Sequence, residues 1–429
     1  MKTAILHADV RFIERPFRVP LHLSTGAITS ITEAQAAVMV RVDGREATGR
    51  GTIYLSDLWA WPKAPLDHAG RDAVLRQVCT EIAGRLPELC GGEAEHPLEL
   101  GLRLHHAISH APFTGLPADP PVLARAMCAS PFDAAIHDAT GIALGRSAFD
   151  FYREPAAIPS ADGLFPGEGA CAAIGRIIEP PRNRLDAWWI VGAHDSLEDE
   201  VASAIRGCGY RCFKQKTTGN TALDAARTAE IYRAVRAYGV ERPRFDVDSN
   251  EANPNPDSVL DYLERLRALD AEAYDALTYL EQPTSRDIAT HRFDWRPVTT
   301  LKPVLIDEGL TDLSSFEEAR AQGWSGFALK TCKGHSFALV AAAWARRHGL
   351  LLALQDLTNP GLAAIHAALF AAHIPTMNGV ELNAAQYTPA ANEAWLPRLA
   401  GLFYPADGRH DVSGVIGAPG LGSVLSNRS

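Results

Sequence analysis

The sequence lacks several features that define whole classes of protein. No apolar run approaches the roughly 18 residues that a membrane-spanning helix needs, and the first residues, "MKTAILHADVRF", contain no apolar signal-peptide core. The net charge is −10, and no basic cluster is interleaved with aromatic residues, so a nucleic-acid-binding surface is not expected. We therefore expect a cytoplasmic protein that binds neither nucleic acid nor membrane.

Cysteine is scarce and irregularly placed. The seven cysteines are scattered over 429 residues, which indicates reduced, buried thiols rather than a disulfide framework. Cys208 and Cys212 form a C-x-x-x-C pair, but no second pair completes a zinc site. With 47% hydrophobic and 21% charged residues, the chain has the composition of a globular protein, long enough for two or three domains or for one large barrel with an appendage.

The first part of the chain differs in pattern from the rest. In residues 1–130, strand-like alternation in "EAQAAVMVRVDG" precedes helical spacing in "DAVLRQVCTEIAGRL", which predicts an α+β unit. Residues 130–152 predict one apolar helix that ends near Gly145. The stretch 153–184 is rich in Pro, Gly and Arg and has no clear periodicity, so we interpret it as a linker or inserted loop.

From residue 185 onward, strands and helices alternate regularly. Strands are predicted within 185–193, 210–216, 242–250, 276–283, 302–309, 325–332, 350–356 and 378–384. Eight strands that alternate with helices are typical of a (β/α)₈ barrel. A doubly wound open sheet is the alternative, but no Gly-rich phosphate-binding turn follows the first strand.

Charged and amide residues recur at the carboxyl ends of these strands, where barrels place their chemistry. They are Lys216, Asp248, Glu281, Asp307, Lys330, Gln355 and Glu381. Strand alternation puts Lys214 on the same face as Lys216, and Asn250 on the same face as Asp248. Three carboxylates on consecutive strands would repel one another, so we expect a divalent cation between them. Ligation by oxygen alone suits Mg²⁺ or Mn²⁺ better than zinc.

The lysines on either side of these carboxylates indicate proton transfer. Lys216 and Lys330 are predicted on strands that stand nearly opposite each other across a barrel mouth, where they would flank a substrate carboxylate. Positive charge from Lys214 and the cation would lower the pKa of Lys216, which lets it act as a base. Removal of the proton α to a carboxylate gives an enediolate, and nearby positive charge stabilises it.

The ordered set of motifs resembles the enolase superfamily, specifically its muconate-lactonizing-enzyme-like subgroup in the mandelate racemase/muconate lactonizing enzyme family. The motifs are K-x-K in "FKQK", D-x-N in "DVDSN", E-Q-P in "YLEQPT", D-E in "LIDEG", K-x-x-K in "ALKTCK" and a glutamate in "GVELN". The helix "FDAAIHDATGIALGRSAFDFY" resembles the family's domain-junction helix, and "GAPGLG" resembles its C-terminal ending. The resemblance covers most of the chain.

This resemblance implies a role for each motif residue. It implies that Asp248, Glu281 and Asp307 bind the metal and that Lys216 and Lys330 form the acid/base pair. Lys214 would tune the pKa of Lys216, and Asn250 and Glu308 would support the metal ligands from outside the ligand set. Glu381 would lie near the substrate carboxylate. The resemblance also implies an α/β fold in which a (β/α)7-8 TIM-type barrel carries an N-terminal α+β capping domain. The capping domain would span 1–130 and the barrel 131–405, with the junction helix and the 153–184 insertion. A tail over 406–429 would pack back on the cap.

The expected activity is Mg²⁺-dependent removal of the proton α to the carboxylate of a small-molecule substrate. Two opposed lysines favour a racemase, an epimerase or a cycloisomerase, because together they serve both faces of the substrate. The alternatives are an acid-sugar dehydratase or other β-eliminating lyase of the superfamily, and a non-catalytic barrel with a retained metal site. Gln355, on a strand that lacks histidine, disfavours a mandelate-racemase-type dyad, and the absence of D-x-D at strand eight disfavours a dipeptide epimerase. A homo-oligomer is expected.

Several other residues are interpreted as structural. Lys333 is expected to be a solvated loop lysine, and Asp246 to be paired deeper in the barrel. The two tryptophans of "YLSDLWAWP" either face the substrate or pack in the core. The segment "GHSF" around Ser336 lacks the closing glycine of a nucleophile elbow, so a serine hydrolase is not expected.

Overall fold

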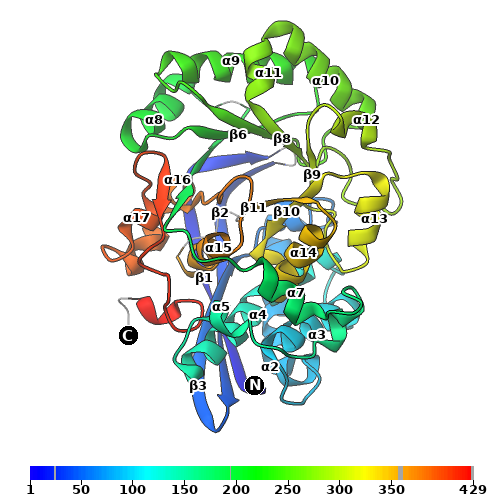
Figure 1. Ribbon diagram of the computed structural model, residues 1–429, viewed down its shortest axis with the longest axis vertical. Helices are drawn as coiled ribbons and strands as arrows, with labels where there is room; N and C mark the ends of the chain where they lie inside the picture. Colours follow the sequence, from blue (N-terminus) through cyan, green and yellow to red (C-terminus); the bar gives the residue numbers. More distant parts are fainter. Residues whose placement is uncertain (24–25, 194, 356–360, 427–429) are drawn as a thin grey trace.

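A computed structural model describes residues 1–23, 26–193, 195–355 and 361–426 (Figure 1). The N-terminal part contains an antiparallel sheet in the order β1 (Thr3–Leu23), β2 (Gly26–Val42) and β3 (Arg45–Tyr54). Side chains alternate along β2, so that Ala36 and Val38 are buried whereas Met39 is 39% exposed. Asp43 and Gly44, with φ angles of 49° and 80°, form the tight turn between β2 and β3. The sheet thus has one buried and one more exposed face.

The buried face of this sheet is covered by the longest helix of the chain's first half. The helices here are α1 (Asp57–Ala60), α2 (His68–Leu89), α3 (Pro97–His110) and α4 (Val122–Leu144). Helix α4 approaches β3 closely at Gly49 and Gly51, where a Cβ atom would overlap the backbone of Ala139 or Pro131. It begins earlier than the predicted residue 130, but it ends where predicted, at Gly145 with a left-handed φ of 68°.

The segment 153–184 is more regular than predicted. After α5 (Ala148–Phe151), it contains the short helices α6 (Pro159–Asp162) and α7 (Ala170–Ile177). Cys171 and Ile174 of α7 are buried, and α7 packs against α14 (His335–Arg347) of the barrel. The interpretation as a linker or inserted loop is therefore wrong for the residues of α6 and α7, which are helical, whereas the placement of 153–184 as an insertion stays a prediction. A helix of two turns offers too few residues for its apolar face to be recognised as a period.

The remainder forms the barrel. Its strands are β5 (Trp188–Val191), β6 (Cys212–Lys216), β7 (Arg244–Asp248), β8 (Leu277–Glu281), β9 (Val304–Ile306), β10 (Gly326–Lys330) and β11 (Leu351–Gln355). The intervening helices are η1 (Leu197–Val201), α8 (Ala202–Cys208), α9 (Thr221–Ala237), α10 (Pro256–Leu269), α11 (Ala271–Ala276), α12 (Arg296–Thr299), α13 (Ser315–Gln322), η2 (Thr331–Lys333), α14 and α15 (Leu362–His373). All the strands pair in parallel, in sequence order from β5 to β11.

The sheet closes through a pair of residues where the eighth strand was predicted. Glu381 forms a bridge with Gln355 at the end of β11, and Val380 forms a bridge with Ala187, the residue before β5. Asn378 strengthens this closure, since its side chain accepts a hydrogen bond from Leu354 N at 3.0 Å and donates one to Leu354 O at 2.9 Å. The predicted α/β fold with a (β/α)7-8 barrel is confirmed, with the eighth position reduced to two bridging residues.

The C-terminal segments return to the junction between the two parts. They are α16 (Ala384–Tyr387), η3 (Pro389–Trp395), α17 (Ala400–Phe403), β12 (Arg409–Asp411), which pairs with β4 (Arg184–Asp186), and η4 (Ser423–Leu425). Asp138 of α4 accepts hydrogen bonds from Arg50 N of β3 at 2.9 Å and from Leu421 N at 2.8 Å. One buried carboxylate thus holds the N-terminal sheet and the tail together. Among the described residues, no helix has the length and apolarity that a bilayer crossing requires.

Candidate active site

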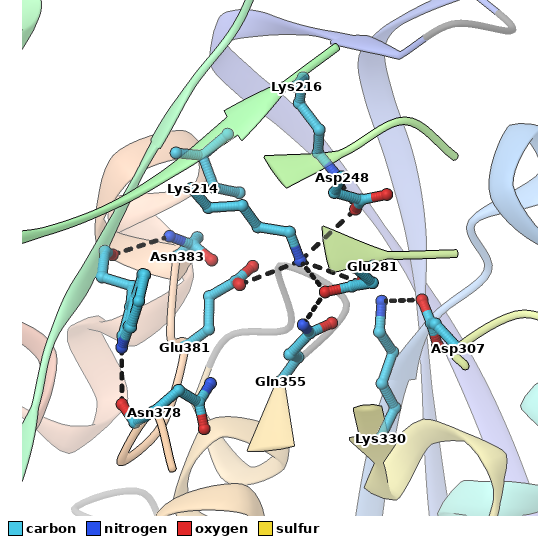
Figure 2. Close-up of polar contacts among 12 residues, drawn as sticks. Lys214, Lys216, Asp248, Glu281, Asp307, Lys330, Gln355, Asn378, Glu381 and Asn383 are labelled. Atoms are coloured by element: carbon cyan, nitrogen blue, oxygen red, sulfur yellow. Dashed lines mark hydrogen bonds and ion pairs between the residues drawn. The ribbon is translucent and has the colours of Figure 1, made fainter. Parts of the chain in front are cut away.

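The carboxyl ends of the strands bring the predicted residues together at one mouth of the barrel (Figure 2). Lys216 lies opposite Asp248 in the pairing of β6 with β7, and Asp248 lies opposite Glu281 in the pairing of β7 with β8. On the other side of the mouth, Lys330 lies opposite Gln355. Parallel pairing in register therefore places side chains that are far apart in sequence at the same height.

Lys214 lies at the centre of this group. Its ammonium group is 2.9 Å from Glu281 Oε2, 3.1 Å from Glu381 Oε2 and 3.4 Å from Asp248 Oδ2, and its side chain is 1% exposed (Figure 2). Burial alone would lower the pKa of Lys214, but these carboxylates raise it well above its ordinary value. Lys214 therefore stays protonated and serves as a fixed positive charge.

Lys216 points toward the same carboxylates from a more exposed position. Its ammonium group is 2.5 Å from Asp248 Oδ2 and donates to Asn250 Oδ1 at 3.2 Å. Lys214 and Lys216 thus share Asp248 Oδ2, as expected for two lysines on one face of β6. Burial acts against ionisation of Asp248, but the charges of Lys216 and Lys214 bring its pKa down to about 2.

Two amide side chains fix the ends of β7 and β8. Asn250 donates from its backbone N to Asp248 Oδ1 at 2.9 Å and from Nδ2 to Glu308 Oε1 at 3.0 Å. Gln282 accepts hydrogen bonds at Oε1 from Asp307 N at 2.8 Å and from Gly309 N at 3.1 Å. These contacts set the positions of three acidic residues.

Asp307 forms ion pairs with both lysines of the K-x-x-K motif. Lys330 Nζ lies 2.8 Å from Asp307 Oδ2, and Lys333 Nζ lies 2.9 Å from Asp307 Oδ1. The two ammonium groups hold the pKa of Asp307 below its ordinary value although burial opposes this. Burial would lower the pKa of Lys330, but Asp307 and Glu281 raise it above its usual range. Lys333 is 1% exposed, so the prediction of a solvated lysine is wrong.

The N-terminal part reaches the site through Trp59 of α1. Its indole Nε1 donates to Glu308 Oε1 at 2.9 Å, and its ring lies 5.0 Å from the Lys330 ammonium group. Burial, followed by the charges of Asp307 and Asp248, raises the pKa of Glu308 to about 7. The sequence had left Trp59 open between substrate contact and core packing. The structure instead places it against a predicted acid/base lysine.

The charges at the mouth do not balance. Six acids (Asp246, Asp248, Glu281, Asp307, Glu308 and Glu381) are gathered with four lysines (Lys214, Lys216, Lys330 and Lys333), and all but Lys216 are buried. By formal charge the acids of this set outnumber its lysines by two, and burial raises the pKa of Glu281 well above its usual value. Burial raises the pKa of Asp246, like that of Glu308, to about 7, so protonation relieves part of the excess. The charge of Lys214 and a contact with the Tyr279 hydroxyl act in the opposite direction on the Asp246 pKa, so Asp246 faces polar groups deeper in the barrel, as predicted.

The donor set at the mouth fits a divalent cation by charge and by chemistry. Asp248, Glu281 and Asp307 are fully buried, come from neighbouring strands and offer only oxygen atoms, which suits Mg²⁺. At present each of these carboxylates contacts a lysine ammonium group. In this arrangement no three His, Cys, Asp or Glu side chains of the described ranges surround one point closely enough to hold a metal ion. The metal ligand set therefore stays a prediction.

A second, buried polar cluster lies between α4 and the start of α14. Ser336 Oγ lies 2.7 Å from His137 Nε2 and 2.7 Å from Asp133 Oδ1. Tyr152 Oη lies 2.8 Å from His137 Nδ1. Ser336 and His137 are both 0% exposed, and Ser336 N also donates to Asp133. This cluster joins α4 to α14 and offers no nucleophile to a substrate, in agreement with the exclusion of a serine hydrolase.

The barrel and its charged mouth define the class of protein. Residues 196–429 match a family model described as enolase C-terminal domain-like. Because the match covers more than half of the chain, the chain belongs to this family. Within the enolase superfamily it falls in the mandelate racemase/muconate lactonizing enzyme group, which confirms the predicted family and, with it, the prediction of an enolase-superfamily enzyme. A comparison with curated proteins gave no match.

Solved structures of the same fold cover nearly the whole chain. Muconate lactonizing enzyme from Pseudomonas fluorescens, complexed with muconolactone, is 19% identical, with 98% of this chain and 96% of that chain covered and a TM-score of 0.66. An enolase from Bradyrhizobium, complexed with magnesium and mandelic acid, is 20% identical, with coverages of 98% and 96% and a TM-score of 0.63. Dipeptide epimerase from Enterococcus faecalis, complexed with Mg and L-Leu-L-Tyr, is 16% identical, with coverages of 98% and 99% and a TM-score of 0.66. These likenesses confirm the fold.

Proposed function

We propose that the protein is a Mg²⁺-dependent enzyme that removes the proton α to a substrate carboxylate, most readily as a racemase, an epimerase or a cycloisomerase. One observation carries this proposal. Lys216 and Lys330 approach a group of buried carboxylates from β6 and β10, the second and sixth positions of an eight-position barrel. Lysines on opposite walls of one mouth suit removal of a proton from one face of the α-carbon and return to the other.

Each residue has a place in this reaction. Asp248, Glu281 and Asp307 would hold Mg²⁺, which supplies positive charge to the substrate carboxylate as negative charge develops on it. Lys216 and Lys330 would exchange protons with the α-carbon. Lys214 would hold Glu281 and Glu381 in place as a permanent cation.

The choice of an isomerase is supported by the presence of both lysines and by the neighbours. A muconate lactonizing enzyme and a dipeptide epimerase share the fold, and two of the solved structures named above are complexed with magnesium. Muconolactone, mandelic acid and a dipeptide all carry a carboxyl group. A small carboxylic acid with an acidic α-proton is therefore the proposed substrate class.

Proton exchange in D₂O tests the proposal. The protein is incubated with Mg²⁺ and a library of chiral carboxylic acids, and loss of the α-proton signal is followed by NMR. We expect exchange with at least one acid, and Lys216→Ala and Lys330→Ala should each abolish exchange on the face that the lost lysine serves. The control is Lys302→Ala, because Lys302 donates to Leu277 O at 2.8 Å at the amino end of the barrel strands and should not matter.

The outcomes separate the alternatives. Exchange that survives on both faces in Lys216→Ala and in Lys330→Ala would refute the acid/base roles. A product that has lost water, with one of the two lysines dispensable, would identify a dehydratase. Mg²⁺ binding without exchange of any acid would identify a non-catalytic barrel with a retained metal site.

A further inference from the structure

Trp59 makes two contacts that core packing does not require. It belongs to the short helix α1 of the N-terminal part and is 4% exposed. Its indole N–H donates to Glu308, a barrel residue that also accepts from Asn250, and its ring faces the Lys330 ammonium group. The neighbouring Trp61 is buried to a similar degree, at 6% exposed, and both tryptophans belong to the apolar cluster of the N-terminal part.

These contacts join the two predicted acid/base lysines. The Lys330 ammonium group lies 5.0 Å from the centre of the Trp59 ring. The indole nitrogen of Trp59 in turn donates to Glu308 Oε1 at 2.9 Å. The same oxygen accepts from Asn250 Nδ2 at 3.0 Å, and Asn250 Oδ1 accepts from Lys216 Nζ at 3.2 Å. The Trp59 indole therefore contacts Lys330 of β10 directly. It is connected to Lys216 of β6 indirectly, through the side chains of Glu308 and Asn250.

Helix α1 is held in place from both sides. Within the N-terminal part, Asp57 is 2% exposed and accepts from Arg71 Nε at 2.6 Å. From the barrel, Arg286 donates to Ala60 O at 3.4 Å, and Arg286 itself is fixed by Glu251, with Nε 2.6 Å from Oε1. An arginine–carboxylate pair at each end limits the rotation of α1, and with it the position of the Trp59 ring.

We propose that Trp59 is a positioning residue that aligns both acid/base lysines and makes their alignment depend on the seating of α1 against the barrel. This inference rests on the proposed function. The ring limits where the Lys330 ammonium group can lie, and the indole N–H holds Glu308, which in turn orients Asn250 toward Lys216. Such contacts from outside the reacting groups commonly change activity by about 10- to 100-fold when removed.

The contact can be tested without a substrate. The chain has eight tryptophans, and the indole ¹H–¹⁵N resonance that disappears in Trp59→Phe identifies Trp59. We expect Glu308→Gln and Lys330→Met each to move this resonance by more than its line width, because the first removes the charge of its acceptor and the second removes the charge over its ring. The Trp61 resonance, identified with Trp61→Phe, should stay in place. A Trp59 resonance that responds to neither change would overturn the proposal.

Exchange kinetics test the functional part, with both enantiomers of the first acid that exchanges in the D₂O experiment. Trp59→Phe keeps a ring but loses the N–H, so exchange on the Lys216 face should fall at least about tenfold while exchange on the Lys330 face changes less. Trp59→Leu loses both contacts, so proton exchange should become slower on both faces of the α-carbon. The change should appear chiefly in kcat rather than in KM. Trp61→Phe is the matched control, and it should leave the ratio of the exchange rates on the two faces unchanged. The proposal would be overturned if Trp59→Phe lowered the exchange rate equally on both faces. It would also be overturned if neither Trp59→Phe nor Trp59→Leu lowered the exchange rate.

The failure of one proposal is distinguishable from the failure of the other. If no acid exchanges with the unmodified protein, the proposed function fails, and the NMR response of the indole still decides whether Trp59 senses Glu308 and Lys330. If exchange occurs and the indole resonance is insensitive to both residues, only the role of Trp59 is lost.

Discussion

Removal of the Lys214 charge should destabilise the protein more than most single changes. Lys214→Met preserves much of the length of the side chain but leaves Glu281, Glu381 and Asp248 without their central ammonium group. Removing one partner of a buried ion pair typically costs about 3–5 kcal/mol, because the remaining charge stays buried and uncompensated. Lys214 is 1% exposed, so solvent cannot take over its role.

This cost translates into a measurable shift of the melting temperature. A chain of 429 residues has an unfolding entropy of about 0.9 kcal/mol/K, from about 2.1 cal/mol/K per residue. A loss of about 3–5 kcal/mol therefore lowers Tm by about 3–6 °C. Adding Glu381→Gln to Lys214→Met removes one of the carboxylates left behind and should recover about 1–3 kcal/mol, since the two sites are in contact and do not act additively.

Thermal unfolding followed by circular dichroism in metal-free buffer checks this prediction. Lys302→Met is the control, because the Lys302 ammonium group contacts a backbone carbonyl instead of buried acids. Two results would refute the reasoning. One is a Tm for Lys214→Met within about 1 °C of the unmodified protein, and the other is a double variant less stable than Lys214→Met alone.

Three further predictions concern the metal, the pH and the packing of the two parts. Asp307→Asn should weaken Mg²⁺ binding at least about tenfold in calorimetric titration, and unchanged affinity would remove Asp307 from the ligand set. Burial lowers the pKa of His366 to about 3, so as the pH falls below about 6.5 only the unfolded chain takes up this proton. Stability should then fall by up to about 1.4 kcal/mol per pH unit, and urea unfolding should show a shallower fall for His366→Gln. Gly51→Ala, whose Cβ meets the backbone of Pro131, should cost about 1–3 kcal/mol in the same assay, whereas Gly207→Ala, with open space around it, should not.

The sequence predicted the barrel and the residues at its mouth because both depend on short-range pattern. Parallel strands of about five residues with helices between them place every strand end at one rim, so the position of Asp248 or Lys330 in its strand is enough to place it at the mouth. The eighth strand was predicted from "NGVELNA" but is reduced to Val380 and Glu381, because its pairing depends on long-range contacts with β11 and Ala187. The sequence places Asp356 directly after Gln355, where a mandelate-racemase-type dyad would have histidine, and Asp356 lies outside the described residues.

Contacts between distant segments could not be predicted from local pattern. Lys333 follows Lys330 by three residues and reads as a loop lysine, yet the turn η2 directs it inward to Asp307. Trp59 gives no sign in the sequence that it meets Glu308, which lies 249 residues further on. The sequence features that could have indicated the inward positions of Glu308 and Lys333 are the D-E pair of "LIDEG" and the K-x-x-K motif, respectively. The homo-oligomer, the cytoplasmic location and the domain boundaries stay predictions.

The backbone at the mouth shows why amide residues recur in the motifs beside the acids. Of the five described residues other than glycine with positive φ, three lie directly after β7 and β8, namely Asn250 at 42°, Glu251 at 71° and Gln282 at 33°. Such conformations cost free energy and persist where hydrogen bonds compensate for them. Here they do, because Asn250 N donates to Asp248, Glu251 N donates to Gln282 O and Gln282 Oε1 accepts from Asp307 N. Each strained residue thus orients an acid or its neighbour. The D-x-N and E-Q-P motifs are therefore best explained as the backbone geometry that points Asp248 and Asp307 into one mouth.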